Sequence, residues 1–359
     1  MKPMRTAVIG TGKIGEIHAE VLRAIPESEL VGVCSRPSPK RDAFAQRHGV
    51  PAFDDLETLV RSTGVEAVTL CTPHLAHAAA AIAAARLGVH VLVEKPLATT
   101  VADCDAMIAA AAQAGVALGV ISQRRLYPPC RRIREAIDRG ELGRPILGSA
   151  VMYGWRDETY YRSDPWRGSW AGEGGGVLIN QSPHPIDLLA WYLGEPAEVF
   201  GFWANLNHPY IEVDDTAVAV VRFAGGALGS LVVSNSQNPA LGGRVLIHGA
   251  NGASAGVQTE SGAMFIAGQT GVGDPPFNDV WTVSGPADLA AWKTADAELF
   301  QAVDATRHFH RLQIQEFLQA AAAGRTPAVS GEAGRRTVQI IEGIYRSNRT
   351  GSPVHYPAA

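Results

Sequence analysis

Lys95 is the residue whose placement most clearly suggests chemistry. It follows the apolar run Val91–Val93 in the sequence VLVEKP, so a buried strand delivers Glu94, Lys95 and Pro96 to its end. The chain has only five lysines, and arginine supplies almost all of its other positive charge. An ammonium group at a strand end can meet a bound cofactor and stabilise negative charge on a reacting oxygen.

A glycine-rich turn, GTGKIG, lies upstream between an apolar strand and a helix. In such a turn Gly10 permits the tight bend, Gly12 lets the backbone approach a pyrophosphate, and Gly15 allows close packing. The helix N-terminus attracts the phosphate charge. The turn therefore predicts a dinucleotide site made by Gly10, Thr11, Gly12, Lys13, Ile14 and Gly15. The alternative is a glycine turn that binds nothing.

The nucleotide preference depends on the residues about 20 positions beyond this turn, where an acidic residue commonly binds the ribose 2′-hydroxyl. This chain has Ser35 and Arg36 there, with Lys40 and Arg41 nearby. A hydroxyl with cations suits a 2′-phosphate, and no carboxylate stands there to repel it. We therefore expect Ser35 and Arg36 to contact the cofactor, with NADP(H) favoured and NAD(H) possible. Alternatively, they are ordinary surface residues after a strand.

Length and composition favour a two-domain globular protein. At 359 residues the chain is too long for one ordinary core. Hydrophobic residues make up 46%, yet no apolar run approaches the roughly 20 residues that span a bilayer. The net charge of −4 gives no broad basic surface, and the arginine cluster at 124–134 is expected to be a solvated helix face. Neither a membrane nor nucleic acid is therefore an expected partner.

The cysteines and the N-terminus favour a cytoplasmic protein. The four cysteines show no CxxC spacing, and Cys34 and Cys71 lie in apolar strand-like runs. Such cysteines pack as small hydrophobic residues, so reduced thiols are expected. Residues 1–10 run straight into a strand and the glycine turn, which leaves no room for a cleaved signal segment.

The first third of the chain alternates short apolar strands with helical segments. The strand-like runs lie at 6–10, 30–35, 67–72, 89–95 and 117–122, separated by segments such as 76–87 and 101–114. This alternation is typical of a parallel sheet with crossover helices. We predict a doubly wound α/β domain over residues 1–122.

From residue 123 onward the pattern changes. The runs 216–223, 227–234 and 244–248 look like consecutive strands without helices between them. Strands in this order form a largely antiparallel sheet. Helices are expected at 300–323 and 334–346, within a second α/β domain of residues 123–359.

Four segments in this order resemble one family. They are GTGKIG at 10–15, CTPHLAH at 71–77, VLVEKPLA at 91–98 and GEGGGVLINQSPHPIDLL at 172–189. Together they are similar to the Gfo/Idh/MocA oxidoreductases over essentially the whole chain. The resemblance implies a Rossmann domain, followed by an α/β domain whose large open sheet builds homodimers or homotetramers. It also implies a small-molecule sugar or cyclitol substrate.

The resemblance also implies roles for single residues. Lys95 and His184 would face the nicotinamide, and further cofactor contacts would come from Thr72, Pro73, His77, Glu94 and Gln123. Many members carry an aspartate four residues before this histidine, whereas this chain has Asn180. Asparagine can orient a substrate hydroxyl but lacks the charge that would raise the basicity of the histidine.

His184 and Lys95 fit alcohol oxidation, which needs a base for the hydroxyl proton and a cation near its oxygen. Ser182 and Pro183 predict a helix start, so His184 would lie at a helix N-terminus, where the dipole keeps imidazole available as a base. Asp187 either orients His184 or occupies a favourable first-turn position.

An aromatic and arginine-rich segment precedes the glycines. Its aromatic faces and polar tips suit a sugar ring, although packing between domains or subunits is an equal alternative for any one residue. With Asn180 and Asp187, the candidate substrate residues are Tyr153, Trp155, Arg156 and Tyr161. The histidines lack a convincing set of partnered ligands, so no metal is expected.

The sequence therefore predicts an NAD(P)-dependent dehydrogenase that acts on a secondary hydroxyl of a sugar, anhydrosugar or cyclitol, or that reduces the ketone. Two alternatives remain. One is a glycosidase that uses bound nicotinamide for transient oxidation and elimination, and the other is a non-catalytic nucleotide-sensing regulator.

Overall fold

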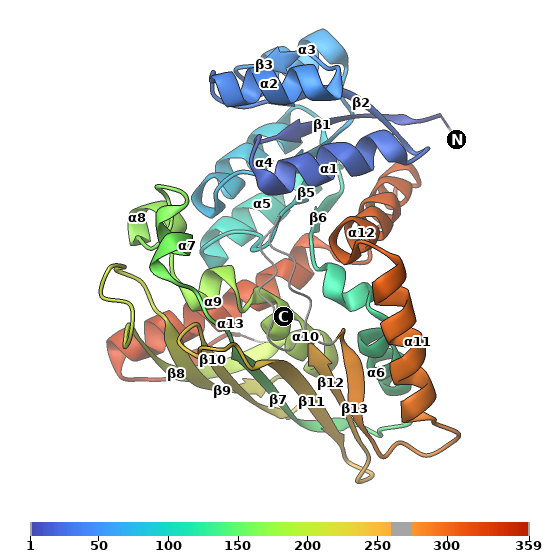
Figure 1. Cartoon of the computed structure of the whole chain (residues 1–359), viewed down its shortest axis with the longest axis vertical. Coiled ribbons are helices and arrows are strands. Elements are labelled where there is room, and N and C mark those ends of the chain that lie inside the picture. The colour runs from blue at the N-terminus through green and yellow to red at the C-terminus, as the bar shows by residue number, and fades with distance from the viewer. Residues whose placement is uncertain (1, 260–274, 358–359) are drawn as a thin grey trace. The chain divides into compact units, whose positions relative to one another are not determined.

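The computed structural model describes residues 2–259 and 275–357 (Figure 1). The described chain forms two compact units. The first contains the residues up to Gln123 together with Ala305–Arg335, and the second contains Arg124–Asp304 and the residues from Arg336 onward. Residues 305–335, which the sequence assigns to the second domain, thus lie in the first unit. The boundary after residue 122 stays a prediction.

The first unit is built on a parallel sheet of six strands. They are β1 (Met4–Ile9), β2 (Ser28–Cys34), β3 (Ala52–Phe53), β4 (Ala67–Leu70), β5 (His90–Val93) and β6 (Leu118–Val120). Their order is β3-β2-β1-β4-β5-β6, so the direction of winding reverses between β1 and β4. This confirms the doubly wound sheet, and ligands bind such sheets beyond the carboxyl ends of the strands at that reversal.

Helices connect these strands. They are α1 (Lys13–Ala24), α2 (Pro39–His48), α3 (Leu56–Thr63), η1 (His74–Ala76), α4 (His77–Arg86) and α5 (Val101–Ala114), with η2 (Gln123–Leu126) at the border of the units. The prediction of a helix at 101–114 is confirmed. The Thr100 side chain accepts a hydrogen bond from the Asp103 amide at its start, and Gly115 ends it with a φ of 67°.

A late helix, α12 (Ala305–Ala322), completes the first unit. Its Gln313 side chain accepts from the Ser122 amide at 2.9 Å and donates to the Val120 carbonyl at 2.8 Å, which fixes the end of β6. The predicted helix at 300–323 is wrong in one respect. Residues 303–304 separate α11 (Leu289–Ala302) from α12, because Val303 adopts an extended backbone.

The second unit is built on an eight-stranded sheet in the order β13-β12-β11-β7-β10-β9-β8-β14. Its strands are β7 (Pro145–Tyr153), β8 (Pro196–Ala204), β9 (Thr216–Phe223), β10 (Leu228–Ser234), β11 (Gly242–Gly249), β12 (Ser254–Thr259), β13 (Phe277–Trp281) and β14 (Val354–His355). The β7–β10 pair is parallel and the other pairs are antiparallel. The predicted mostly antiparallel open sheet is confirmed.

The remaining helices are α6 (Pro128–Asp138), α7 (Glu158–Arg162), α8 (Trp170–Glu173), α9 (Val177–Asn180), α10 (Pro183–Leu193), α11 and the larger part of α13 (Gly331–Thr350). Helix α10 packs on β7 and β11, where Gly148 leaves room for Leu189 and Leu193. Apolar residues alternate along β9, with Val218 and Val220 exposed on the opposite side from the buried residues. The sheet therefore has one packed face and one open apolar face.

The arginine cluster at 124–134 is a solvated face only in part: Arg131 is exposed, but two other members are held by carboxylates, which corrects the sequence-based expectation for them. Arg125 is buried and binds Asp187 through two hydrogen bonds, while Arg132 binds Asp296 through two more. Arg125 thereby joins η2 to α10, and Arg132 joins α6 to α11, because each guanidinium meets a carboxylate. Among residues 2–259 and 275–357, no helix combines the length and apolar character needed to cross a bilayer.

Candidate active site

The glycine turn between β1 and α1 has the geometry of a dinucleotide cradle. Gly10 has a φ of 103°, and a Cβ there would lie 2.6 Å from the Cys71 carbonyl oxygen. A Cβ on Gly15 would lie 2.3 Å from the Gly10 carbonyl oxygen. By contrast, a Cβ on Gly12 would meet no protein atom within 4 Å. The first and third glycines are thus required by the fold, while the second leaves backbone accessible to a ligand.

The neighbouring strand ends carry polar atoms that fit the same ligand. Thr72 follows β4 and Gln123 follows β6, and the buried Thr72 Oγ1 and Gln123 Oε1 atoms have no hydrogen-bond partner within the described residues. Buried polar groups normally have partners, so these atoms are suited to a bound molecule. The turn, with Thr11, Lys13 and Ile14, and these strand ends together fit a bound dinucleotide.

Glu94 holds the backbone of Lys95. Its Oε2 atom accepts from the Lys95 amide at 3.1 Å, and its Oε1 atom lies 2.9 Å from His18 Nε2 and 3.3 Å from His310 Nε2. The Nδ1 atom of His310 faces the carbonyl of Thr306 at 2.8 Å, which orients its ring toward the carboxylate. Both oxygens of Glu94 are therefore engaged within the protein.

This cluster has the composition of a metal site, since His18, Glu94 and His310 each place a donor atom within 4.8 Å of the others. Its members nevertheless contact one another directly, as a buried ion pair does. Burial alone would raise the pKa of Glu94, but the hydrogen bonds from the two histidines outweigh it and hold that pKa well below its ordinary value. The cluster is best described as an ionised carboxylate between two imidazoles.

His77 ties together the ends of β4 and β5. It is fully buried, with Nδ1 2.8 Å from the Pro96 carbonyl oxygen and Nε2 2.9 Å from the Thr72 carbonyl oxygen. Pro96 follows Lys95 directly, and the peptide bond between them is cis. Because both ring nitrogens face backbone carbonyls, the structure gives His77 a supporting position. Pro73, between Thr72 and η1, is exposed.

The end of β2 bears on nucleotide preference. Ser35 is half-buried and Arg36 is exposed, as expected of residues that could meet an adenosine ribose. However, Arg41 is paired with Asp42 at 2.8 Å and also with Asp54, which follows β3. A 2′-phosphate would need cations that no carboxylate neutralises. Arg41 does not meet this condition, because it is paired with Asp42 and Asp54.

In the second unit, two glycines let the segment before His184 pack against buried polar groups. A Cβ on Gly175 would lie 2.2 Å from the Tyr345 hydroxyl, and one on Gly176 would lie 1.9 Å from the Asp214 carbonyl oxygen. The carboxylate of Asp214 accepts from the Gly176 amide at 2.7 Å, the Leu178 amide at 2.9 Å and the Tyr345 hydroxyl at 2.7 Å. Asp214 therefore anchors α9, which carries Asn180.

Asn180 lies in a buried polar cluster whose contacts could not be predicted from the sequence. Its Nδ2 atom donates to the Tyr160 hydroxyl at 3.1 Å and to Glu173 Oε1. The next residue, Gln181, donates to the same hydroxyl at 3.0 Å. Tyr160 also lies beneath the guanidinium of Arg167, at 4.3 Å from the ring centre. The one acidic residue in GEGGG could have drawn attention to Glu173.

His184 is half-buried at the second position of α10, as the sequence predicts. Asp187 has other partners than a substrate. It is buried and accepts from Arg125 Nε at 2.8 Å and from Arg125 Nη2 at 2.6 Å, with Thr337 Oγ1 at 3.4 Å. This ion pair joins α10 to η2, so Asp187 is better described as an anchor of the helix that carries His184.

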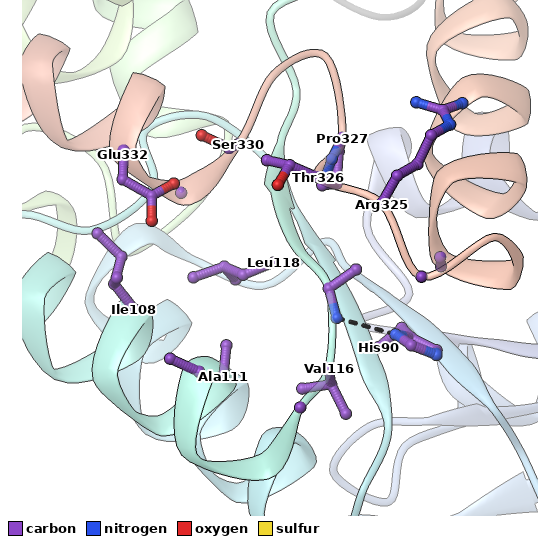
Figure 2. A pocket seen from close by; sticks show the side chains of 16 residues that line it. His90, Ile108, Ala111, Val116, Leu118, Arg325, Thr326, Pro327, Ser330 and Glu332 are labelled. Atoms are coloured by element: carbon purple, nitrogen blue, oxygen red, sulfur yellow. Dashed lines mark hydrogen bonds between the residues drawn. The ribbon is translucent and has the colours of Figure 1, made fainter.

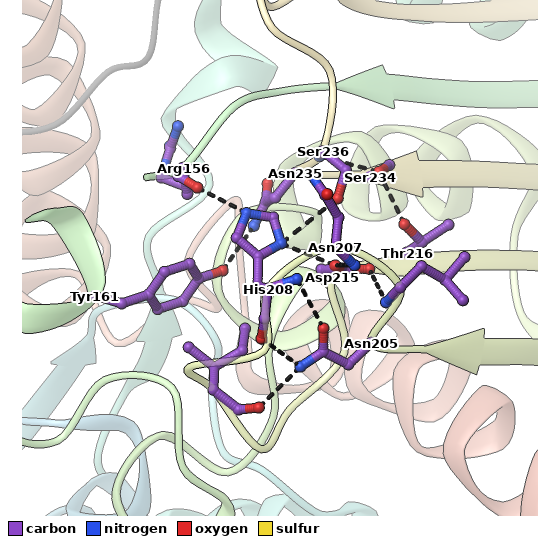
Figure 3. A network of polar contacts seen from close by, with 12 residues as sticks. Arg156, Tyr161, Asn205, Asn207, His208, Asp215, Thr216, Ser234, Asn235 and Ser236 are labelled. Atoms are coloured by element: carbon purple, nitrogen blue, oxygen red, sulfur yellow. Dashed lines mark hydrogen bonds and ion pairs between the residues drawn. The ribbon is translucent and has the colours of Figure 1, made fainter. Parts of the chain in front are cut away.

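The aromatic segment surrounds a second buried pair (Figure 3). His208 Nδ1 lies 2.8 Å from Asp215 Oδ2, and Nε2 lies 2.7 Å from the Arg156 carbonyl oxygen. Burial would raise the pKa of Asp215, but hydrogen bonds from His208 and two backbone amides lower it to about 2. Tyr161 and the Trp155 ring lie beside His208, each at 5.7 Å between ring centres. No motif in the sequence pointed to His208.

The aromatic segment is fixed by hydrogen bonds to neighbouring elements. Tyr153 ends β7, and Trp155 and Arg156 follow it. The Asn235 side chain donates to Gln181 Oε1 at 3.0 Å and to the Tyr161 hydroxyl at 3.4 Å, which links this segment to α9. The second unit thus carries an imidazole at a helix N-terminus and a network of hydrogen-bonded amides and phenols, groups that suit recognition of hydroxyl groups.

A pocket of about 230 Å³ in the first unit does not belong to this chemistry (Figure 2). Its lining includes His90, the first residue of β5, and residues 115–118 before β6. It lies at the amino ends of the strands, whereas Gly10, Thr72 and Lys95 lie at the carboxyl ends. His90 accepts a hydrogen bond from the Ala117 amide at 2.9 Å and so serves the fold there.

We expect Gly176→Ala to destabilise the second unit, because the added Cβ would overlap the Asp214 carbonyl oxygen. The free energy of unfolding should fall by about 1–3 kcal/mol. Chemical denaturation should show no such loss for Gly225→Ala, where a Cβ would meet nothing within 4 Å. Equal stability of Gly176→Ala and wild type would contradict the close approach.

Comparison with known proteins identifies the family. Residues 4–122 match the model of the oxidoreductase family with an NAD-binding Rossmann fold, and residues 130–255 match the GFO/IDH/MocA C-terminal domain. The chain is 28% identical over 344 residues to a myo-inositol 2-dehydrogenase from Thermotoga maritima, covering 94% of each chain. It is 28% identical over 240 residues to a scyllo-inositol 2-dehydrogenase (NAD(+)) from Bacillus subtilis, covering 65% of this chain and 68% of the relative.

A solved structure shows the same likeness. The WlbA dehydrogenase from Bordetella pertussis, in complex with NADH and UDP-GlcNAcA, superimposes with a TM-score of 0.86 at 26% identity. The match covers 100% of this chain and 99% of that chain. The sequence motifs, both family models and the fold agree, and this chain belongs to the Gfo/Idh/MocA oxidoreductases.

Proposed function

We propose that this protein is a nicotinamide-nucleotide-dependent dehydrogenase that oxidises a secondary hydroxyl of a sugar, anhydrosugar or cyclitol, or reduces the ketone. The observation that carries the proposal is the buried Glu94 cluster, which fixes Lys95 at the same sheet edge as the dinucleotide turn. Membership in an oxidoreductase family supports the same reaction class.

Lys95 and His184 divide the proton chemistry in this proposal. The nicotinamide, when bound, accepts the hydride from the carbinol carbon. Lys95 donates a hydrogen bond to the reacting oxygen and stabilises its negative charge, while His184 accepts the hydroxyl proton. Its position at the N-terminus of α10 favours the neutral ring, because the helix dipole disfavours a cation there.

The polar groups around Asn180 support the proposed substrate class. Asn180, Gln181 and the tyrosines of α7 offer amide and phenol groups in a rigid frame, which suits several hydroxyl groups on one ring. Two relatives carry inositol dehydrogenase names, and the WlbA structure contains UDP-GlcNAcA. Cyclitols and free or nucleotide-linked sugars therefore form the first panel.

Replacing Lys95 by alanine should lower kcat at least about 100-fold with any active substrate, because the oxygen loses its cation. The dissociation constant of the nucleotide should change less than threefold. Turnover is measured by the absorbance of the reduced nucleotide, and binding by calorimetry. Lys293→Ala is the matched control, since Lys293 lies over the Phe277 ring on the second unit.

Undiminished turnover of Lys95→Ala would contradict the proposed mechanism. Release of an aglycone without net nucleotide reduction would instead identify the glycosidase alternative. Tight nucleotide binding without turnover on the whole panel would favour the sensor alternative.

We propose NAD(H) as the working nucleotide, in place of the NADP(H) that the sequence favours. Arg41 forms ion pairs with Asp42 and Asp54, so these carboxylates already neutralise the charge that a 2′-phosphate would need. The family model and the relative named for NAD(+) support this choice. Ser35 and Arg36 remain the proposed contacts to the ribose.

Asp54→Asn should raise kcat/KM for NADP relative to NAD about tenfold, which corresponds to ~1.4 kcal/mol. The reason is that the substitution leaves Arg41 paired with Asp42 alone and removes a carboxylate that would repel the phosphate. Asp105→Asn, which removes a carboxylate from the exposed Arg335 pair, should leave the ratio unchanged. A wild-type preference for NADP would overturn the NAD(H) proposal.

We also propose that the open face of the second sheet joins copies of this chain. Phe202 is 64% exposed and Val220 is 58% exposed, and they lie beside Phe200, Val218 and Val232 across β8, β9 and β10. A contiguous apolar patch of this kind marks an association surface. The size of the oligomer and the cytoplasmic setting stay predictions.

Phe202→Glu combined with Val220→Glu should reduce the oligomer to monomers, because two carboxylates would be buried without partners. Light scattering after size exclusion measures the mass of each species. Leu87→Glu, at an exposed leucine of the first unit, should leave the mass unchanged. An unaltered mass of the double variant would exclude this face as the interface.

A further inference from the structure

Glu173 is a buried carboxylate to which the mechanism above gives no role. It ends α8 and is 1% exposed. Its Oε2 atom accepts from the Gly168 amide at 2.7 Å, and its Oε1 atom accepts from Asn180 Nδ2. A carboxylate buried this deeply is costly unless its partners compensate it, so its position next to Asn180 calls for an explanation.

The contact determines which end of the Asn180 amide faces inward. An ionised carboxylate only accepts hydrogen bonds, so it must face the NH₂ group rather than the oxygen. The second N–H of that group donates to the Tyr160 hydroxyl at 3.1 Å. Tyr160 is in turn held by Gln181 and Arg167. With both N–H bonds directed at Glu173 and Tyr160, the Asn180 Oδ1 atom is directed to the other side of the amide.

We propose that Glu173 is a positioning residue, which holds Asn180 so that Oδ1 accepts a hydrogen bond from a substrate hydroxyl next to His184. Through this contact Glu173 also supplies the negative charge that an asparagine at position 180 lacks. The inference rests on the proposed dehydrogenase function, since it concerns the substrate side of that site.

The surroundings make this carboxyl titrate near neutral pH. Burial raises the pKa of Glu173 to about 7, against the lowering effect of the hydrogen bonds from Gly168 and Asn180 and of the Arg167 charge. The other groups that face it are Asp214 before β9, Tyr160 and Tyr161 on α7 and Tyr345 on α13. Asp214 raises the pKa further.

Protonation of Glu173 would reverse the amide. The acid form can donate to Asn180 Oδ1, which turns the NH₂ group toward the substrate and removes the acceptor. The productive form is therefore the ionised one, present above about pH 7. Together with His184, which must be neutral to act as a base, this gives two groups that each have to lose a proton.

Glu173→Gln tests the role directly. The Gly168 amide requires an oxygen opposite it, so the new NH₂ group would face Asn180 and reverse its amide. We expect kcat/KM for the polyol to fall at least tenfold, mainly through KM, with nucleotide affinity unchanged. The acid limb of log kcat/KM against pH should lose the ionisation with a midpoint near pH 7. Glu212→Gln, an exposed carboxylate that accepts from the Trp170 amide, is the matched control.

A second variant separates positioning from damage to the fold. Glu173→Gln combined with Asn180→Asp restores an amide–carboxylate pair in reverse order, with an oxygen again presented to the substrate. It should recover at least tenfold in kcat/KM over Glu173→Gln alone. Glu173→Gln should also gain in Tm relative to wild type as the pH rises from 4.5 to 7. Over that range the Glu173 carboxyl is ionised in the unfolded chain but still protonated in the folded one, so the stability of wild type falls.

The free protein gives a readout that needs no turnover. The side-chain ¹⁵NH₂ resonance of Asn180, identified by its loss in Asn180→Asp, should titrate with a midpoint near pH 7 in wild type and not in Glu173→Gln. No titration in wild type would overturn the inference, whatever the activity. Wild-type kinetics in Glu173→Gln would also overturn it while leaving the dehydrogenase function intact, whereas an inactive wild type with a titrating resonance would count against the function alone.

Discussion

The buried carboxylate of Glu94 is the constraint on which the nucleotide half of the site depends. An ionised group at this depth has to be compensated on every side, and it is met by His18 from α1, His310 from α12 and the Lys95 amide. The helix that opens after the glycine turn, the strand end that carries the lysine and a helix more than 200 residues later are thereby joined at one point. This explains why residues 305–335 return to the first unit.

In the second unit, the carboxylate of Asp214 fixes the backbone of a site segment. Asp214 accepts from the backbone of Gly176 and Leu178, and this holds the short helix that carries Asn180. A Cβ on Gly175 would collide with the Tyr345 hydroxyl, and a Cβ on Gly176 would collide with the Asp214 carbonyl oxygen. Both halves therefore place chemically important residues on short segments whose backbone is fixed by a buried acid, which is how a flexible side chain gains a defined position.

The fold could be predicted from the sequence because strand and helix periodicity are local signals, as the exact limits of α5 at 101–114 show. The reactive residues could be placed at strand and helix ends for the same reason. The hydrogen-bond partners of these residues could not be predicted from the sequence. The sequence suggests Asp187 as a substrate ligand, but in the structure Asp187 binds Arg125. The negative charge that Asn180 lacks lies seven residues earlier, on Glu173. Pairings of this kind depend on tertiary contacts between segments that no spacing rule connects.

The proposed mechanism requires Lys95 and His184 to act on the same oxygen. A crystal structure of the protein with bound nicotinamide nucleotide and a polyol that it oxidises tests this most directly. The account predicts one substrate hydroxyl within about 3.2 Å of both Lys95 Nζ and His184, with its carbon next to the nicotinamide ring. A reacting hydroxyl that contacts neither residue, or a His184 that faces away from the nucleotide, would contradict it.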